Sequence, residues 1–200
     1  MRGFSDEERD EIREDLIETG RELFLRWGPE KTNVADVTDE VGIAKSTFYR
    51  FFDSKSELYF EVFVRERDDF LDALTTELGG VEDAETGLRT LFEVYFTWIE
   101  QSPPIQRVVL ENEYEAVYRN VSEEAVAEEM DVMLDTLAPI LEAWQRDGEM
   151  RAVDPLPFFG LMKSIGLLAL YQEEFGEYGE DWYAEIRELL LDSVAKGLTV

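Results

Sequence analysis

Apolar residues recur at intervals of three and four along most of the chain, which is the spacing of one face of an α-helix. No stretch carries a strong strand pattern, and no internal repeat is visible. The pattern therefore predicts an all-α protein of about nine helices. The helices are expected over residues 5–28, 33–41, 44–52, 55–78, 84–102, 105–118, 122–146, 155–171 and 182–196.

One stretch in the N-terminal third predicts two short amphipathic helices joined by a tight turn. Asn33 and Asp36 have the spacing of a capping box at the start of the first helix. Gly42 stands where a left-handed residue ends that helix, and the second helix covers residues 44–52. Another capping box, Ser54–Glu57, starts the longer helix that follows.

The second short helix has one apolar side and one polar side. Phe48 and Phe52 are four residues apart and form its apolar face. Lys45, Ser46 and Thr47 lie at its N-terminal end, which is the end that meets base edges in a DNA-binding helix-turn-helix. An ordinary helical hairpin with a solvated polar face fits the same periodicity, so the spacing leaves both interpretations open.

A longer ordered set of motifs runs through the same region. It comprises Glu22-Leu23-Phe24, Gly28, Lys31-Thr32, Val34-Ala35-Asp36-Val37, Val41-Gly42-Ile43, Lys45, Thr47-Phe48-Tyr49, Phe52, Ser54-Lys55 and Glu57-Leu58. From about residue 12 to residue 63 the chain thus resembles the N-terminal domain of the TetR family of transcriptional regulators. Two departures bear on its function: Ala44 and Ser46 replace a common Ser and Gly, and Pro29 replaces a common aromatic residue.

The resemblance implies a helix-turn-helix DNA-binding domain over residues 1–53 and a helical effector-binding and dimerisation domain over residues 54–200. It further implies a homodimer on double-stranded operator DNA, with one recognition helix in each major-groove half-site of a palindrome. Lys45 is expected to read a base edge, guanine for preference, with Ser46 and Thr47 nearby. Phosphate contacts are expected from Thr32, Asn33, Tyr49 and Lys55, and Arg50 suits either kind of contact.

The middle of the chain is rich in aromatic residues. In the similar family, helices of this region enclose a ligand pocket, so the resemblance implies a small apolar or aromatic effector held by stacking or cation–π contact. The candidate lining residues are Phe92, Tyr95, Trp98, Tyr114, Tyr118 and Trp144, with Glu111, Glu113 and Glu115 nearby. Aromatic residues at helical spacing are equally typical of an ordinary core, and glutamates of a solvated surface.

The last two predicted helices carry broad apolar faces. In the similar family, two such helices from each subunit form a four-helix bundle at the dimer interface. The candidate interface residues are Phe158, Met162, Ile165, Leu168, Ile186, Leu190 and Val194. The core of a single chain would use such residues in the same way.

The composition excludes several kinds of chemistry. The chain has no cysteine and no histidine, which rules out disulfides, the usual zinc sites and imidazole acid–base catalysis. Only carboxylates remain and no spacing singles out an acid–base pair, so we expect neither an enzyme nor a cofactor. We see no signal peptide, and the apolar stretch 158–171 contains Lys163 and is too short to span a bilayer. A cytoplasmic protein without a membrane partner is expected.

The net charge of −28 is unusual for a protein expected to bind DNA. Residues 1–60 hold nine Lys and Arg against fifteen Asp and Glu, a net of −6, which leaves −22 for residues 61–200. Three of the five lysines, Lys31, Lys45 and Lys55, lie in or beside the helix-turn-helix. Sparse lysine on an acidic surface favours a halophilic protein working in a salt-rich cytoplasm, where charges are strongly screened. The alternative is a mildly acidic mesophilic regulator.

These observations lead us to expect a homodimeric, ligand-responsive transcriptional regulator, more specifically a repressor that leaves a palindromic operator when its effector binds. The alternative is a protein of the same fold that acts without a small-molecule ligand, as an activator or a DNA-organising factor.

Overall fold

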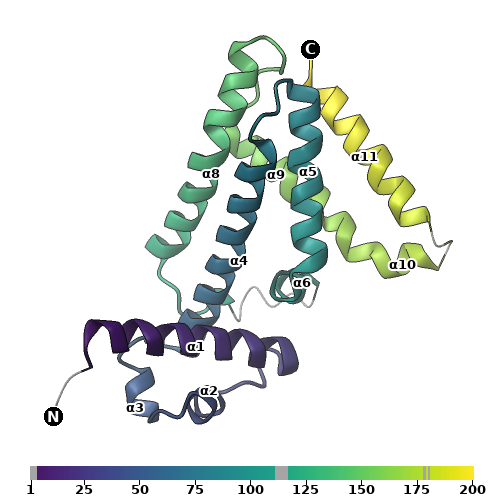
Figure 1. Ribbon diagram of the computed structural model, residues 1–200. Helices are drawn as coiled ribbons and strands as arrows, with labels where there is room; N and C mark the ends of the chain where they lie inside the picture. The colour runs from purple at the N-terminus through teal and green to yellow at the C-terminus, as the bar shows by residue number, and fades with distance from the viewer. Residues whose placement is uncertain (1–3, 111–116, 178, 180) are drawn as a thin grey trace. The chain divides into compact units, whose positions relative to one another are not determined.

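The computed structural model describes residues 4–110, 117–177, 179 and 181–200, and this part of the chain is helical, with one isolated β-bridge between Met150 and Thr199. The all-α prediction is confirmed. The elements are α1 (Asp6–Trp27), α2 (Val34–Val41), α3 (Lys45–Phe48), α4 (Lys55–Leu78), α5 (Ala84–Gln101), α6 (Pro103–Leu110), α8 (Glu123–Arg146), α9 (Pro155–Gly166), the 3-10 helix η1 (Leu167–Tyr171), α10 (Gln172–Gly176) and α11 (Trp182–Leu198) (Figure 1).

The chain forms two compact units, and neither is continuous in sequence. The first unit comprises residues 1–67 and 103–126, and the second comprises residues 68–102 and 127–200. Both α4 and α8 begin in the first unit and continue into the second. The functional boundary expected after residue 53 remains a prediction, because compactness by itself assigns no function.

Local capping interactions fix the helix starts of the first unit, as the sequence predicted. The Asn33 side chain accepts hydrogen bonds from the backbone N–H groups of Ala35 and Asp36, and the Asp36 carboxylate accepts one from the N–H of Asn33. Gly42 ends α2 with φ of 78°, a left-handed conformation that suits glycine. Ser54 accepts from the N–H of Glu57 at the start of α4.

The core of the first unit joins α1 to the other helices of the motif. Figure 1 shows α1 lying across α2 and α3. The rings of Phe24 in α1 and Tyr59 in α4 meet edge to face, with centroids 4.1 Å apart. The buried residues of this core are Leu16, Ile17, Leu23, Phe24, Val34, Val37, Phe48, Phe52, Leu58, Tyr59, Phe60, Val62 and Val117.

The helix predicted over residues 44–52 is shorter in the structure. It ends at Phe48, and the chain continues as a turn in which the N–H of Arg50 bonds to Thr47 and that of Phe51 bonds to Phe48. Ala44 has no side-chain cap to offer, and these i to i+3 bonds tighten the backbone. The tightened turn still buries both Phe48 and Phe52.

In the second unit, α5 packs against both α9 and α11. The helix predicted over residues 155–171 is broken there, since α9 ends at Gly166 and η1 follows. A Cβ atom on Gly166 would lie 2.6 Å from the ring of Tyr95, so α9 approaches α5 closely at that residue. Glycine is also a poor helix former, which accounts for the change to the tighter 3-10 geometry. Asp154 and Asp181 occupy the N-cap positions of α9 and α11 but make no side-chain capping hydrogen bond.

A second close approach in this unit is testable. A Cβ on Gly87 of α5 would lie 2.2 Å from the ring of Trp144, which is only 8% exposed and has little room to move. We therefore expect Gly87→Ala to destabilise the protein by about 1–3 kcal/mol, visible as a lower melting temperature. Gly160→Ala is the matched control: it is also helical but has no atom within 4 Å of the new methyl group, and should be neutral or slightly stabilising. Equal effects of the two changes would contradict the packing described here.

Candidate nucleic-acid interface

The turn between α2 and α3 is held by backbone hydrogen bonds. The N–H groups of Gly42 and Ile43 both donate to the carbonyl of Thr38, each at 3.0 Å. Val37 of α2 and Phe48 of α3 are fully buried, so both helices are fixed against the core of the first unit. The polar residues of α3 are consequently carried on a rigid support, as a recognition element requires.

Four of the predicted DNA-contacting residues lie together on the surface. Lys45, Ser46, Tyr49 and Arg50 are exposed, and they occupy α3 and the turn that follows it. Thr47, between them, is half-buried. These side chains combine an ammonium, a guanidinium, hydroxyls and an aromatic ring, which are the groups that contact base edges and phosphates.

Thr32 has a different role from the phosphate contact predicted for it. Its side chain is fully buried, and its hydroxyl donates a hydrogen bond of 2.8 Å to the carbonyl of Gly28. A hydroxyl placed in this way closes the α1–α2 loop and is not available to DNA. Asn33 uses its side-chain oxygen to cap α2, but its exposed amide N–H₂ group is still suitable for a phosphate.

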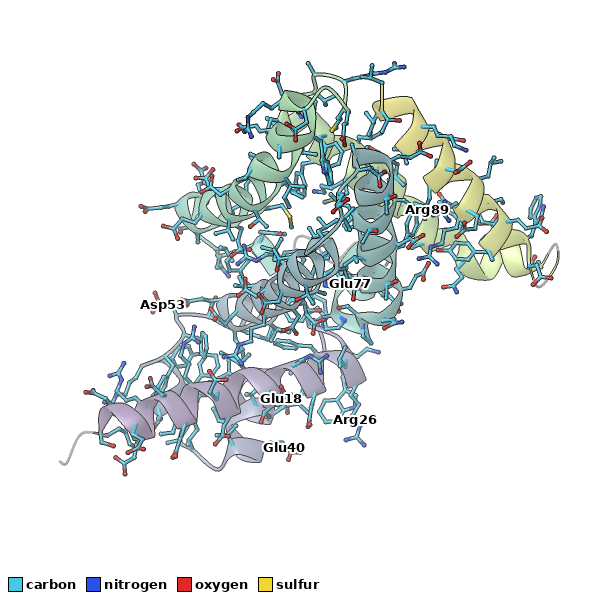
Figure 2. The ribbon with its side chains drawn as sticks, turned by 45° about the horizontal axis from the view of Figure 1, so that its top comes forward. Glu18, Arg26, Glu40, Asp53, Glu77 and Arg89 are labelled. Atoms are coloured by element: carbon cyan, nitrogen blue, oxygen red, sulfur yellow. The ribbon has the colours of Figure 1, made fainter. Side chains whose placement is uncertain are left out.

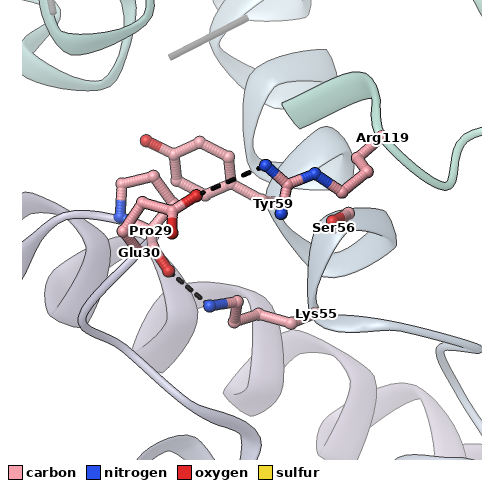
Figure 3. A pocket seen from close by; sticks show the side chains of 6 residues that line it. All are labelled: Pro29, Glu30, Lys55, Ser56, Tyr59 and Arg119. Atoms are coloured by element: carbon pink, nitrogen blue, oxygen red, sulfur yellow. Dashed lines mark hydrogen bonds and ion pairs between the residues drawn. The ribbon is translucent and has the colours of Figure 1, made fainter. Parts of the chain in front are cut away.

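Lys55 holds the α1–α2 loop from the start of α4. Its ammonium donates to the carbonyl oxygen of Pro29 (Figure 3). It also donates to the carbonyl oxygen of Thr32, at 2.7 Å. An ammonium has three N–H donors, so one remains for the predicted phosphate contact. The observed role of Lys55 is therefore to hold the α1–α2 loop. Its position in a DNA-binding motif did not predict this role.

Two contacts of the first unit were not foreseen from the sequence. The guanidinium of Arg50 lies over the ring of Phe4, 5.0 Å from its centroid. Arg119 reaches the carboxylate of Glu30 at 3.8 Å, beside a cavity of about 60 Å³ that Lys55 also lines (Figure 3). Both pairs join residues far apart in sequence, and no local spacing signals them.

Exposed carboxylates cover the helices around this interface. Glu18, Glu40 and Asp53 of the first unit extend to solvent (Figure 2). The hydrogen-bonded Arg65 guanidinium lowers the pKa of the Glu14 carboxyl, so that acid is also ionised at neutral pH. The positive charge of Lys45 and Arg50 is thus local and is not part of a wide basic surface.

The predicted effector-binding residues are divided between the two units. In the second unit, Trp98 stacks on Phe70 with centroids 4.9 Å apart and lies 5.9 Å from Tyr95. Phe92 is fully buried against Phe158, and Trp144 packs on Gly87 as described above. Tyr118 belongs to the first unit, where it packs on α4. Tyr114 and the three nearby glutamates, 111, 113 and 115, lie outside the described residues.

The predicted dimer-interface residues divide by exposure. Phe158, Met162 and Ile165 are buried within the single chain, so they have no surface to offer to a second copy. Leu168, Ile186, Leu190 and Val194 are half-buried. The large apolar residues that are exposed in the same helices are Leu156, Leu167, Tyr171, Trp182 and Leu189.

Helix α3 is short, exposes cationic and polar groups, and is joined to α2 by a tight turn above a buried core. These features define a helix-turn-helix DNA-binding protein.

The comparisons with known proteins agree. A family model described as "Bacterial regulatory proteins, tetR family" matches residues 16–62. The transcriptional activator FasR of Mycolicibacterium smegmatis is 26% identical over 190 residues, which are 94% of this chain and 80% of FasR. The transcriptional repressor KstR2 of Rhodococcus jostii is 24% identical over 193 residues, covering 92% of this chain and 85% of KstR2.

Solved structures share the fold. A TetR-family regulator from Pectobacterium atrosepticum superposes with a TM-score of 0.72 at 23% identity, covering 98% of both chains. FadR from Bacillus subtilis, in complex with stearoyl-CoA, gives a TM-score of 0.69 at 15% identity, covering 92% of this chain and 98% of FadR. Residues 16–62 thus match the TetR family of bacterial regulatory proteins, and the chain shares its fold with a solved TetR-family regulator. Within the described residues, no helix has the length and hydropathy needed to cross a membrane.

The exposure of Lys45 leads to a test of the interface. Its side chain makes no hydrogen bond or ion pair with any described residue, so Lys45→Ala should leave the melting temperature unchanged. If Lys45 reads a base edge, the change should cost about 1–3 kcal/mol of specific binding and relax sequence preference at one position of each half-site. Binding-site selection with the variant and the wild type, each read by sequencing, measures this.

Lys55→Met is the contrasting variant. It removes both bonds to the α1–α2 loop and should therefore lower the melting temperature, and weaken binding to all DNA sequences alike. The assignment of roles fails if the two variants have the same thermal stability and the same sequence preference.

Proposed function

We propose that this protein is a homodimeric transcriptional regulator that binds a palindromic operator and is released from it by a small-molecule effector. The observation that carries the proposal is the exposed α3, with Lys45 and Ser46 at its N-terminal end on a buried support. In a helix-turn-helix this end enters the major groove. Lys45 reads a base edge, and Asn33, Tyr49, Arg50 and Lys55 contact phosphates on either side.

A second copy of the chain covers the exposed apolar residues of the second unit. Leu189 is 69% exposed, Leu156 58% and Leu167 48%, which are high values for large apolar side chains. They lie on α9, η1 and α11, the C-terminal helices that the family resemblance assigns to the dimer interface. Large apolar side chains exposed to this extent favour association. We therefore place the interface on these exposed residues and no longer on Phe158, Met162 and Ile165, which are buried within the single chain.

The effector is a small apolar molecule received beside the stacked rings of the second unit. The Trp98 Nε1–H group is buried and has no hydrogen-bond acceptor among the described residues. An unsatisfied buried donor is costly, and an acceptor on a ligand would relieve that cost. Because FadR of Bacillus subtilis has stearoyl-CoA bound, compounds with an apolar acyl chain are the first to test, as free fatty acids and as acyl-CoA thioesters.

The direction of regulation is repression, relieved when the effector favours a geometry that does not fit DNA. The relatives include the activator FasR as well as the repressor KstR2, so activation, or DNA binding without any ligand, is the competing function. Transcription from the protein's own promoter, measured with and without the regulator, separates repression from activation.

The acidic surface gives the DNA binding an unusual salt dependence. A DNA-binding protein that makes 6–10 phosphate contacts loses about 10³–10⁵ in affinity between 50 and 200 mM salt. Here the net charge of −28 repels DNA at low salt, and this repulsion is screened as salt rises. We expect affinity for the protein's own promoter to change by less than about tenfold between roughly 0.1 and 1 M KCl. Fluorescence anisotropy measures it, and a thousandfold loss would contradict the proposed adaptation to salt.

The dimer face predicts the effect of one surface charge. Leu189→Glu changes an exposed residue, so the monomer should fold normally, but a carboxylate in an apolar interface costs about 2 kcal/mol or more. We expect the variant to sediment as a monomer and to lose most of its operator affinity. Val132→Glu, at a residue of α8 that is 41% exposed, is the control and should remain dimeric. A dimeric Leu189→Glu protein would show that the interface lies elsewhere.

A further inference from the structure

The first unit contains a piece of chain that lies far from the helix-turn-helix in sequence. Residues 117–125 follow α5 and α6 and include the first three residues of α8, yet they are assigned to the same compact unit as α1, α2 and α3. The structure describes this stretch without a gap. We name it the 117–125 segment.

The 117–125 segment is part of the core of that unit. Val117 has no exposed surface and belongs to the same buried cluster as Phe24 and Phe48. Val121 and Ala125 are half-buried against this cluster. A residue with no exposed surface fixes the position of its neighbours, because protein interiors are close-packed and do not deform continuously.

Aromatic contacts orient α4 against the 117–125 segment. The ring of Tyr118 meets Phe60 edge to face at 5.7 Å and Phe63 at 6.2 Å, with interplanar angles of 66° and 67°. Phe60 and Phe63 are successive positions on one face of α4, and Tyr59 of the same helix turn packs on α1. Tyr118 therefore fixes the part of α4 that also carries Lys55.

A polar contact extends this hold to the α1–α2 loop. Arg119 pairs with Glu30 at 3.8 Å (Figure 3). Lys55 donates hydrogen bonds to the carbonyls of Pro29 and Thr32 in the same loop. The loop leads directly into Asn33, which caps α2. The loop before α2 is thus held from two sides, by α4 and by the 117–125 segment.

We propose that the 117–125 segment positions the helix-turn-helix for DNA, so that DNA affinity depends on Val117, Tyr118 and Arg119 although none of them contacts DNA. The inference rests on the proposed DNA-binding function. It means that a movement of α8, which continues from this segment into the second unit, can change DNA affinity by displacing the segment. The apparent affinity is then the intrinsic affinity multiplied by the fraction of molecules that remain in the binding-competent arrangement.

The test uses the full-length protein with Val117→Ala and Tyr118→Leu. Both variants should weaken specific promoter binding by roughly tenfold at a temperature where each is fully folded by circular dichroism. Hydrogen exchange of the α2 and α3 amides should be faster, and that of α5 and α11 unchanged. Ile99→Val, a buried change in the second unit, is the control and should alter stability without altering DNA affinity.

A surface variant tests the same proposal if the core variants fail to fold. Arg119→Gln leaves the core intact and should weaken binding by about two- to fivefold, as expected for an exposed ion pair. Adding Glu30→Gln should then have no further effect, because the pair is already broken. Fully additive effects would mean that Arg119 and Glu30 act on DNA independently, each only through its own electrostatic field.

Unchanged promoter affinity together with unchanged exchange of α2 and α3 in folded Val117→Ala and Tyr118→Leu proteins would overturn the proposal. So would equally faster exchange in both units, which indicates general destabilisation. If the wild type binds no promoter sequence specifically, the proposed function fails. The exchange measurement still decides whether the 117–125 segment positions α2 and α3.

Discussion

The interface depends on the burial of two phenylalanine side chains. Helix α3 has only four residues, far fewer than an isolated helix needs to be stable in water. It persists because the side chains of Phe48 and Phe52 are buried in the core of the first unit, and this burial anchors the backbone between the two residues. Removing that burial would leave Lys45 and Ser46 without a fixed direction. The DNA-binding surface is therefore a property of the core beneath it.

The same core explains how an acidic protein can present a local site for DNA. Cationic side chains beside carboxylates commonly form ion pairs, as Arg65 does with Glu14. Lys45 sits on a helix whose neighbouring residues are small or aromatic, and no described residue competes for its ammonium. The ammonium of Lys55 donates two hydrogen bonds to backbone carbonyls, and these bonds hold the loop in place. Burial and hydrogen bonding, more than net charge, decide which cations reach DNA.

The features that could be predicted from the sequence are those set by neighbouring residues. The Asn33 capping box, the left-handed Gly42 and the ends of α5 and α8 depend on side chains within one helical turn, and all are present. The break of α9 at Gly166 was missed because the apolar spacing continues through this residue, and its close approach to Tyr95 involves another helix. An i to i+4 pattern alone gives no sign of such a contact.

The same limit applies to the candidate site. The exposure of Lys45, Tyr49 and Arg50 follows from the apolar spacing of Phe48 and Phe52, and was predictable. The burial of Thr32 was not, because its hydroxyl bonds to a carbonyl in a loop whose path depends on Lys55. Tyr118 was grouped with the effector-binding aromatics because the family resemblance assigns its region to a ligand pocket, and its packing on Phe60 and Phe63 of α4 had no signal in the sequence.

The most direct test of the central claim is DNase I footprinting of the full-length protein on the DNA upstream of its own gene. A dimer that reads DNA through two α3 helices predicts two symmetric protected half-sites whose centres lie one helical turn, about 34 Å, or a multiple of it apart. Protection should survive an excess of unrelated DNA. Absence of protection, or continuous coverage without half-sites, would contradict the assignment of α2 and α3 as a sequence-reading pair.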